Sequence, residues 1–421
     1  MTGDGARRLL VHDYAGHPFQ VQLSRELARR GHEVLHLHFG GFQTPKGPLA
    51  RRADDPQTFA VEGLSIGEPF QKYRYARRLI QERRYGSVLA ERILGFAPDV
   101  VISANSPLDA QVAAQKASDR CGARFVFWIQ DVYSVAIAKT LRQRAPVIGP
   151  LVARRFTRLE QQTLRGSDAV VAITADFVPL LTTWGVSADR ITVIENWAPL
   201  DDIRPLPKVN EWSRMHGLAD KRVVMYSGTL GLKHDPAAFL SLAAGLADND
   251  NVRVVVISEG LGADWLRERS ADHPNLVLLP FEPFDAMSRV LASGDVLMAV
   301  LEPEAGVFSV PSKVLSYLAA GRPILGSIPA DNLAAQIIVR EGAGRIVAPG
   351  HPDDLLVAAR ELLADAGARR AAGANARAYA EAAFDIGRIA DRFQAVLIPE
   401  GAGIPAFARR SLADPFVGTR Q

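Results

Sequence analysis

Residue types that bind phosphate stand together at Pro311, Ser312 and Lys313, between an apolar run and a helix-length run. Proline suits the first turn of a helix, because the amide hydrogen that it lacks would have no intrahelical partner there. The neighbouring backbone amides would then point at an anion. Alone, the tripeptide is better explained as an ordinary helix cap. Gly321 and Pro323 are suited to end the same helix, and the complete segment favours an anion-binding function.

A second group of candidate anion ligands follows the apolar run at 222–227. Gly228 and Gly231 permit close approach of the backbone, and Lys233 offers a cation before the next helix-length segment. Position alone supports an anion ligand and an ordinary surface lysine equally. The surrounding motif favours the anion ligand.

In the N-terminal half, polar residues also follow apolar runs. Gly16 and His17 lie after the first run, and Asp131 lies after the run at 124–129. A carboxylate at Asp131 could orient or deprotonate a substrate hydroxyl, and it could equally cap the next helix. A lone loop histidine is more often structural or solvated than catalytic, so the loop position of His17 does not by itself indicate chemistry.

These loops belong to a repeating pattern of short β-branched runs and helix-length segments, which predicts parallel sheets in an α/β fold. The runs lie at 8–13, 33–39, 99–104, 124–129, 168–173, 222–228, 252–257, 276–280, 295–300, 323–326 and 344–347. Ligands bind at the carboxyl ends of parallel strands, so the loops after these runs are expected to carry the chemistry.

A proline-bearing stretch at 196–207 interrupts the pattern and predicts a linker. We therefore expect an N-terminal domain at 1–200, a C-terminal domain at 201–385, and a C-terminal helix and tail at 386–421 that crosses back to the first domain. Two facing domains imply a cleft between them.

The segment at 301–326 and the paired α/β halves resemble the retaining GT-B glycosyltransferases of glycosyltransferase family 4, over most of the chain. The similarity is closest to the bacterial branch that assembles colanic acid, O-antigen and related envelope polysaccharides. That branch shares the Pro-Ser-Lys form and the Asn-Trp pair found at Asn196 and Trp197. The resemblance implies two Rossmann-like, doubly wound domains facing a central cleft, with the acceptor on the N-terminal domain and the nucleotide sugar on the C-terminal one.

The implied activity is transfer of a hexosyl or N-acetylhexosaminyl group (EC 2.4) from a UDP- or GDP-linked donor, with retention. The acceptor is a glycan or a polyprenyl-phosphate-linked glycan. We expect Lys233, Asp131 and Glu304 to be catalytic, with Lys233 stabilising the charge on the leaving group. The implied donor-binding residues are Gly16, His17, Gly228, Thr229, Lys233, Glu259, Gly260, Phe281, Val310, Pro311, Ser312, Lys313 and Ser316.

The sequence departs from the family pattern at three positions. Phe308 and Ser316 stand where relatives carry paired glutamates, and Thr229 stands where an arginine often accompanies the lysine. The second glutamate commonly holds the donor ribose, whereas Ser316 offers one short, uncharged hydroxyl. Glu302 and Glu304 lie just upstream, and we prefer Glu304 as the carboxylate near the donor sugar.

Composition excludes several other classes of protein. The chain has 421 residues, 48% of them hydrophobic, and a single cysteine, Cys121, which cannot form an internal disulfide. No apolar run reaches the roughly 20 residues that a membrane helix needs, so a cytoplasmic protein is expected. The basic charge shows no nucleic-acid motif, so nucleic acid is not an expected partner. No obligatory metal or other cofactor is expected, because no histidine cluster or Asp-x-Asp motif stands out.

Two basic amphipathic stretches, at 72–84 and 147–159, suit either an anionic membrane surface or solvated outer helices. The first alternative would place the protein peripherally on the inner face of the cell membrane. Two functional alternatives also stay open. A nucleotide-sugar 2-epimerase uses a similar two-domain cleft, and a non-catalytic GT-B partner subunit would explain Phe308, Ser316 and Thr229.

Overall fold

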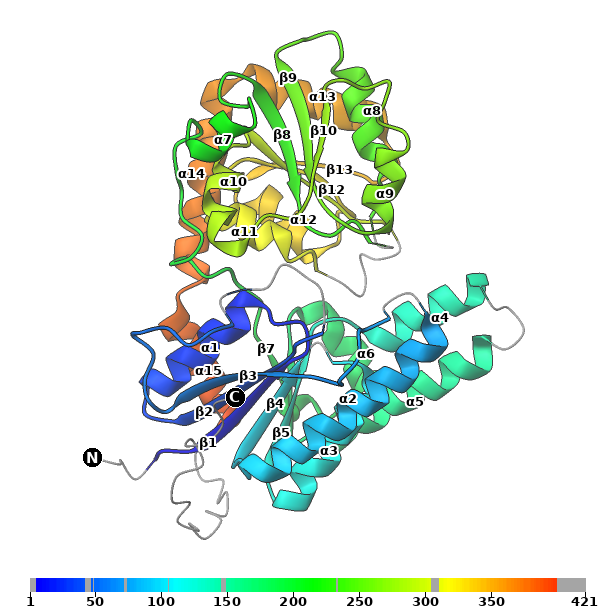
Figure 1. The fold of residues 1–421 in the computed structure, drawn as a ribbon, viewed down its shortest axis with the longest axis vertical. Helices are drawn as coiled ribbons and strands as arrows, with labels where there is room; N and C mark the ends of the chain where they lie inside the picture. The colour runs from blue at the N-terminus through cyan, green and yellow to red at the C-terminus, as the bar shows by residue number, and fades with distance from the viewer. Residues whose placement is uncertain are drawn as a thin grey trace.

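The computed structural model describes residues 5–41, 47, 49–71, 74–104, 106–144, 149–231, 234–303 and 310–399. Figure 1 shows two α/β domains, one above the other. The expected tail at 401–421 lies outside the described residues, as do Lys233, Glu304 and Phe308.

The N-terminal domain contains a parallel sheet in the order β3-β2-β1-β4-β5-β6-β7. Its strands are β1 (Arg8–Asp13), β2 (Glu33–Phe39), β3 (Phe59–Leu64), β4 (Val100–Ala104), β5 (Arg124–Ile129), β6 (Ala169–Ala172) and β7 (Ile191–Val193). Its helices are α1 (Pro18–Arg29), α2 (Tyr75–Phe96), α3 (Leu108–Cys121), α4 (Tyr133–Arg144), α5 (Gly149–Gly166) and α6 (Val178–Thr183), with 3-10 turns η1 (Ala175–Phe177) and η2 (Ala188–Arg190). The central strand β4 is buried throughout and β5 is buried after its first residue, as expected for a parallel sheet covered on both faces.

The C-terminal domain repeats this plan with the strand order β10-β9-β8-β11-β12-β13, also parallel. Its strands are β8 (Arg222–Ser227), β9 (Val252–Ile257), β10 (Leu276–Leu279), β11 (Val296–Val300), β12 (Ile324–Ser327) and β13 (Gly344–Val347). Its helices are α7 (Glu211–Met215), α8 (Ala237–Gly245), α9 (Leu261–Arg267), α10 (Met287–Ala292), α11 (Lys313–Ala319), α12 (Leu333–Arg340), α13 (Pro352–Ala364) and α14 (Ala366–Ala383), with the 3-10 turn η3 (Phe284–Ala286).

The predicted fold of two doubly wound α/β domains is therefore confirmed. The sequence pattern missed β3 and β7, which are the two edge strands of the first sheet. Both are only partly buried, and β7 has three residues, so neither produces a continuous apolar run. The expected domain boundaries at residues 200 and 385 stay predictions.

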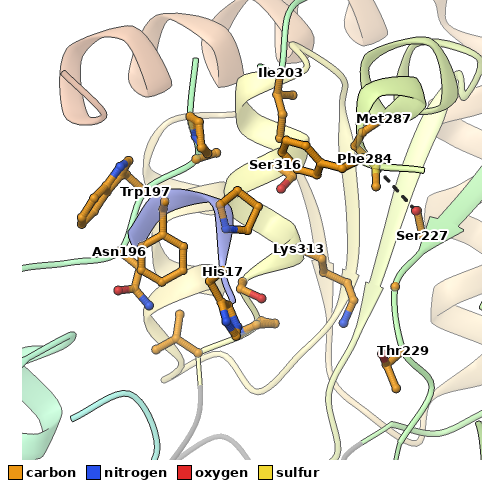
Figure 2. Close-up of a pocket in the computed structure, with 18 of the residues that line it drawn as sticks. His17, Asn196, Trp197, Ile203, Ser227, Thr229, Phe284, Met287, Lys313 and Ser316 are labelled. Carbon is orange, nitrogen blue, oxygen red and sulfur yellow. Dashed lines mark hydrogen bonds between the residues drawn. The ribbon is translucent and has the colours of Figure 1, made fainter. Parts of the chain in front are cut away.

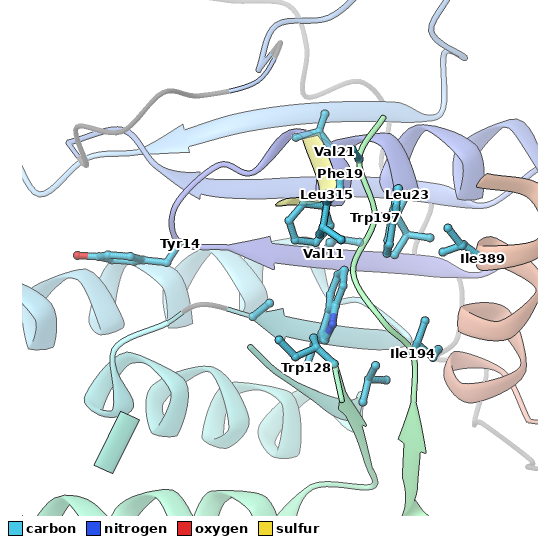
Figure 3. Packing of buried hydrophobic residues seen from close by; sticks show 14 of the residues in the cluster. Val11, Tyr14, Phe19, Val21, Leu23, Trp128, Ile194, Trp197, Leu315 and Ile389 are labelled. Atoms are coloured by element: carbon cyan, nitrogen blue, oxygen red, sulfur yellow. The ribbon is translucent and has the colours of Figure 1, made fainter. Parts of the chain in front are cut away.

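The last helix, α15 (Ile386–Leu397), returns from the C-terminal domain and packs against α1. Its Phe393 ring lies 4.6 Å from that of Trp128 and 5.9 Å from that of Trp197, measured between centroids. Trp128 and Trp197 stack at 5.9 Å, and Phe19 meets Trp197 edge-on at 5.1 Å. Figure 3 shows Phe19, Trp128 and Trp197 together, with Ile389 of α15 nearby. Such aromatic pairs contribute about 0.5–1.5 kcal/mol each beyond area burial.

This aromatic cluster fixes the segment that leads out of the first sheet. Trp197 follows β7 and is 1% exposed, and its indole nitrogen donates to Gln22 of α1 at 2.8 Å. The chain then passes Asp202, which pairs with Arg52 at 2.9 Å and accepts a hydrogen bond from Ser288 of α10 through its carbonyl. The segment that connects the domains is thus fixed by contacts with both of them.

Candidate functional site

A cavity of about 350 Å³ lies where the two domains face one another. It is lined by loops that follow β1, β5, β8, β10 and β11 and by the segment after β7. Its residues from the N-terminal side and the connection are His17, Pro18, Phe19, Gln130, Asp131, Ile173, Asn196, Trp197, Ala198, Pro199 and Ile203. Its residues from the C-terminal domain are Ser227, Gly228, Thr229, His234, Phe281, Glu282, Phe284, Met287, Leu301, Val310, Pro311, Ser312, Lys313 and Ser316. We call these two sets the N wall and the C wall; Figure 2 shows part of both.

His17 occupies the N wall as the residue before α1, and Pro18 starts that helix. Asp13, at the end of β1, is fully buried and accepts hydrogen bonds from the backbone amides of Ala15 and His17. The imidazole Nδ1 of His17 lies 3.5 Å from the Asp13 carboxylate, and its side chain is 33% exposed. With its amide oriented to donate, Gln20 reaches both carboxylate oxygens at 2.8 Å. The carboxylate therefore fixes the whole turn between β1 and α1.

The Asp13–His17 pair favours its charged form. Burial acts to raise the pKa of Asp13, but the charge of His17 and its hydrogen bonds outweigh burial, so the pKa lies below its usual value. Burial likewise acts to lower the pKa of His17, but Asp13, with a smaller contribution from Asp131, raises the pKa above its usual value. The Asp13 carboxylate, buried behind the cavity wall, thus stabilises the protonated form of His17.

Asp131 lies on the N wall just before α4. The amides of Tyr133 and Ser134, the first two residues of α4, both donate to Glu160 of α5 at 2.9 Å. Glu160 therefore caps the helix at these two amides, a role that the sequence left open for Asp131. Burial raises the pKa of Glu160 to about 6, although hydrogen bonds from Ser134 and Tyr133 act in the opposite direction.

A pair of amide side chains joins two segments of the N wall. Gln130 donates to Asn196 at 3.2 Å, and Asn196 donates in return to Gln130. This exchange ties the loop after β5 to the connection after β7. The Asn-Trp pair therefore has two structural tasks: Asn196 faces Gln130, and Trp197 anchors the aromatic cluster.

On the C wall, the end of β8 is fixed by a buried tyrosine of α11. The hydroxyl of Tyr317 accepts from the Ser227 amide at 3.0 Å and lies 3.3 Å from the Ser227 carbonyl, to which it donates. Gly228 follows with a φ of +145°, a conformation that L residues rarely adopt. A Cβ atom at Gly228 would stand 3.1 Å from Cε of Lys313. The glycine therefore gives Lys313 room beside the strand end.

The segment from Pro311 to Lys313 reaches the cavity, as the sequence led us to expect. The first turn is tight, since the amides of Val314 and Leu315 donate to the carbonyls of Pro311 and Ser312 at 3.1 Å. The α-helix itself begins at Lys313, two residues later than the proline pattern indicated. These two hydrogen bonds span three residues instead of four, so the backbone is wound more tightly at the start of the helix than in a regular α-helical turn.

The other end of the C wall is largely apolar. Phe281, Phe284 and Met287 line it, and Ile203 approaches from the connection, as Figure 2 shows for the last three. Glu282 accepts a hydrogen bond from the indole of Trp212 at 2.9 Å. This part of the cavity suits a flat ring better than a phosphate group.

The structure brings most of the sequence-predicted site residues, both donor-binding and catalytic, to the cavity. His17, Asp131, Gly228, Thr229, Phe281, Val310, Pro311, Ser312, Lys313 and Ser316 all line it. Gly16, Glu259 and Gly260 are not among the lining residues; Gly260 precedes α9 with a φ of 99°. Lys233 and Glu304 lie outside the described residues, so their roles stay predictions.

Several lining residues were not predicted as site residues. Asn196 belongs to the Asn-Trp pair that the sequence singled out, but its pairing with Gln130 across the sheet edge gives no sequence signal. His234 adjoins Lys233 in the chain, but its approach to Lys313 depends on the fold. In the part of the chain that the structure describes, no group of three or more His, Cys, Asp or Glu side chains could hold a metal ion. Within the same residues, no helix is both long and apolar enough to cross a bilayer.

Two family models match the two halves of the chain. Residues 17–197 match "Glycosyl transferase 4-like domain", and residues 221–365 match "Glycosyl transferases group 1". Among curated proteins, the chain is 25% identical over 248 residues to "Putative colanic acid biosynthesis glycosyl transferase WcaI" of Escherichia coli. That match covers 58% of each protein. The chain is also 23% identical over 298 residues to "Probable glycosyltransferase WbjE" of Pseudomonas aeruginosa, and this second match covers 68% of each protein.

Solved structures share the fold at low sequence identity. Anabaena HepE, crystallised with UDP and glucose, gives a TM-score of 0.67 at 16% identity and covers 93% of this chain and 99% of its own. Sucrose-phosphate synthase of Thermosynechococcus elongatus gives a TM-score of 0.67 at 15% identity and covers 92% and 97%. These similarities concern the arrangement of both domains, since they extend over nearly the whole of each chain.

Proposed function

The chain belongs to the GT-B glycosyltransferases of the bacterial envelope polysaccharide branch, and from this premise we propose that it transfers a hexosyl or N-acetylhexosaminyl group from a nucleotide-diphosphate sugar to a glycan. The acceptor is a glycan or a polyprenyl-phosphate-linked glycan of an envelope polysaccharide. We propose that the anomeric configuration is retained, as in the family that the sequence resembles.

The observation that carries the proposal is that the two walls present different polar groups to the same cavity. Lys313 and His234 on the C wall face a cavity whose N wall carries the carboxylate of Asp131. A cation with a neighbouring N–H donor suits the diphosphate of a donor, and a carboxylate suits the hydroxyl of an acceptor. A cleft with both features supports group transfer better than binding alone.

In this proposal the donor lies along the C wall. The base occupies the apolar end near Phe281, Phe284 and Met287, the ribose lies near Ser316, and the diphosphate lies near Lys313. Ser316 lines the cavity where relatives carry a glutamate, so the ribose contact is one neutral hydrogen bond. The UDP and glucose bound by Anabaena HepE support a nucleotide-sugar donor on the same fold.

In the proposed reaction, the bond between the anomeric carbon and the diphosphate oxygen breaks while the acceptor oxygen forms the new bond. Asp131 receives the acceptor proton, and the nucleoside diphosphate leaves with the negative charge. Fixed cations stabilise that charge better than mobile water, because they need no reorganisation when it develops. Lys233 is proposed to share this task with Lys313, and Glu304 to act near the donor sugar.

A surface on the N-terminal domain supports a lipid-linked acceptor. Arg83 of α2 and Arg155 of α5 both pair with Asp109 of α3, at 3.4 and 2.9 Å, which brings these three helices to one face. Ile80 and Leu151 on the same helices are 66% and 72% exposed. Apolar side chains among arginines suit an anionic membrane surface. We propose that this face docks peripherally on the inner side of the cell membrane.

The first test is a thermal-shift screen with UDP-, GDP- and other nucleotide-linked sugars, because a ligand that binds the folded state raises its melting temperature. A donor that binds is then incubated alone and with membrane extracts that supply acceptor. Transfer to an acceptor, or slow hydrolysis with the sugar unchanged, supports the proposal. Conversion of the donor sugar without an acceptor would identify a 2-epimerase, and binding without turnover would identify a non-catalytic partner subunit.

A further inference from the structure

Two side-chain nitrogen atoms converge on the C wall. Nζ of Lys313, the first residue of α11, lies 3.2 Å from Nε2 of His234, which precedes α8. Both residues line the cavity. Figure 2 shows the Lys313 side chain reaching towards the segment that carries Thr229. The contact therefore joins the segment that follows β8 to the first residue of the helix that follows β11.

The imidazole of His234 has a defined tautomer. The backbone amide of Gly231 donates a hydrogen bond to Nδ1 of His234 at 3.1 Å. A backbone amide always donates, so Nδ1 must be the acceptor nitrogen. In neutral imidazole the proton then resides on Nε2, the nitrogen that faces Lys313.

This tautomer makes His234 a hydrogen-bond donor towards the cavity. The ammonium group of Lys313 also has only donors, so in its charged form the two nitrogen atoms bring two N–H groups to one place. An oxygen atom that carries negative charge accepts from both at once. Among the parts of a nucleotide sugar, the phosphate oxygens meet this requirement, whereas a sugar hydroxyl or a base carbonyl is neutral.

The surroundings hold Lys313 in this position. Its Nζ lies 4.9 Å from the centroid of the Tyr226 ring, and the Tyr226 hydroxyl is bound to the Thr229 carbonyl at 2.9 Å. Gly228 leaves room for the lysine stem, as described above. The ammonium group of Lys313 is therefore held in a packed position, unlike that of a flexible surface lysine.

We propose that His234 and Lys313 together bind one phosphate oxygen of the donor diphosphate, and that His234 is a determinant of diphosphate affinity through its Nε2–H group. This inference rests on the proposed function, since it assigns a ligand to the same cavity. It adds a neutral donor to the cationic residues that the sequence indicated. The role follows from the Gly231 hydrogen bond, which fixes the tautomer before any ligand binds.

The test measures binding of UDP and GDP by calorimetry to the full chain and its His234→Phe variant. Phenylalanine keeps a ring of similar size and removes the donor. We expect His234→Phe to weaken nucleoside diphosphate binding by about tenfold to a hundredfold, the range for a hydrogen bond to a charged group. His234→Gln, whose side-chain amide can donate, should retain more affinity. His351→Phe, at an exposed histidine before α13, is the matched control and should bind as the original chain does.

A double variant distinguishes shared binding from a structural role. If both side chains hold one oxygen, the loss in His234→Phe combined with Lys313→Met should be smaller than the product of the two single losses. Unchanged affinity in a His234→Phe variant with an unchanged melting temperature would overturn the inference, as would losses that multiply in full. If the original chain binds neither UDP nor GDP, the proposed function fails first and the inference with it.

Discussion

The polar groups of the N wall are held by buried ionisable side chains: Asp13 fixes His17, and Glu160 fixes the start of α4 next to Asp131. The polar groups of the C wall are held by close packing: Gly228 makes room for Lys313, and the Tyr317 hydroxyl fixes the end of β8. The N wall should therefore respond to pH, and the C wall to changes of side-chain volume. We also expect the N wall to act on the acceptor and the C wall to determine donor affinity.

The largest expected effect separates catalysis from donor binding on the N wall. Asp131→Asn removes the proposed proton acceptor and should reduce turnover by about 10²–10⁴-fold. Affinity for the donor nucleotide should change less than about twofold, because the diphosphate contacts lie on the other wall. Steady-state turnover and calorimetry on one preparation check both quantities. The exposed Asp54, changed to Asn, is the control, and equal turnover in the two variants would remove Asp131 from the mechanism.

On the C wall, we expect a substitution to weaken donor binding. Lys313→Met keeps the length of the side chain and removes its charge, and it should weaken binding of the nucleoside diphosphate by about tenfold to a hundredfold. Changing Lys116, which is exposed on α3, to Met should leave binding unaltered. Donor affinity that survives in Lys313→Met would place the diphosphate elsewhere in the cleft.

A smaller effect tests whether shape holds the C wall. Gly228→Ala forces an L residue into a φ of +145° and brings Cβ to 3.1 Å from Lys313 Cε. The unfolding free energy should fall by about 1–3 kcal/mol, and donor affinity should fall with it. Gly95→Ala is a suitable control, because no atom outside its own helix would lie within 4 Å of the new Cβ. Denaturant-induced unfolding measures this free energy, and equal unfolding free energies for the two variants would contradict the proposed backbone strain at Gly228.

The smallest effect tests whether stability depends on the protonation of Glu160, which caps α4 beside the N wall. The pKa of Glu160 is raised from 4.5 to about 6 by burial, so the folded state binds the proton more tightly than the unfolded state. This contribution to stability is complete below pH 4.5 and is lost as the pH rises through 6, a change of at most about 2 kcal/mol. Glu160→Gln should flatten the pH dependence of unfolding across this interval. Parallel curves for the two proteins between pH 4.5 and 7 would exclude the effect.

The sequence was informative where burial was continuous. The central strand β11 is apolar along its whole length, β5 is apolar after its first residue, Arg124, and such runs identified both sheets. The edge strands β3 and β7 were not predicted, because a strand with only one neighbouring strand is less buried and has no unbroken run of apolar residues. Pro311 was expected in the first helical turn, and the α-helix begins two residues after it, at Lys313.

The site was partly predictable for a similar reason. Residues directly after a strand, such as His17, Asp131 and Gly228, could be named because parallel strands bring their carboxyl ends together. Contacts between distant segments could not be predicted, because Gln130 and Asn196, like His234 and Lys313, are brought together only by the fold of their own domain. Lys233 and Glu304 remain predictions from the sequence.

Hydrogen–deuterium exchange of the full chain, with and without a saturating nucleoside diphosphate, tests the division between the walls most directly. UDP and GDP are each used, and the amides of both walls are followed in the same experiment. We expect slower exchange after β8 at 227–231, after β10 at 281–287 and at 310–316, with little change at 14–19 and 130–134. Protection confined to the two N-wall segments would contradict the assignment of the donor to the C wall.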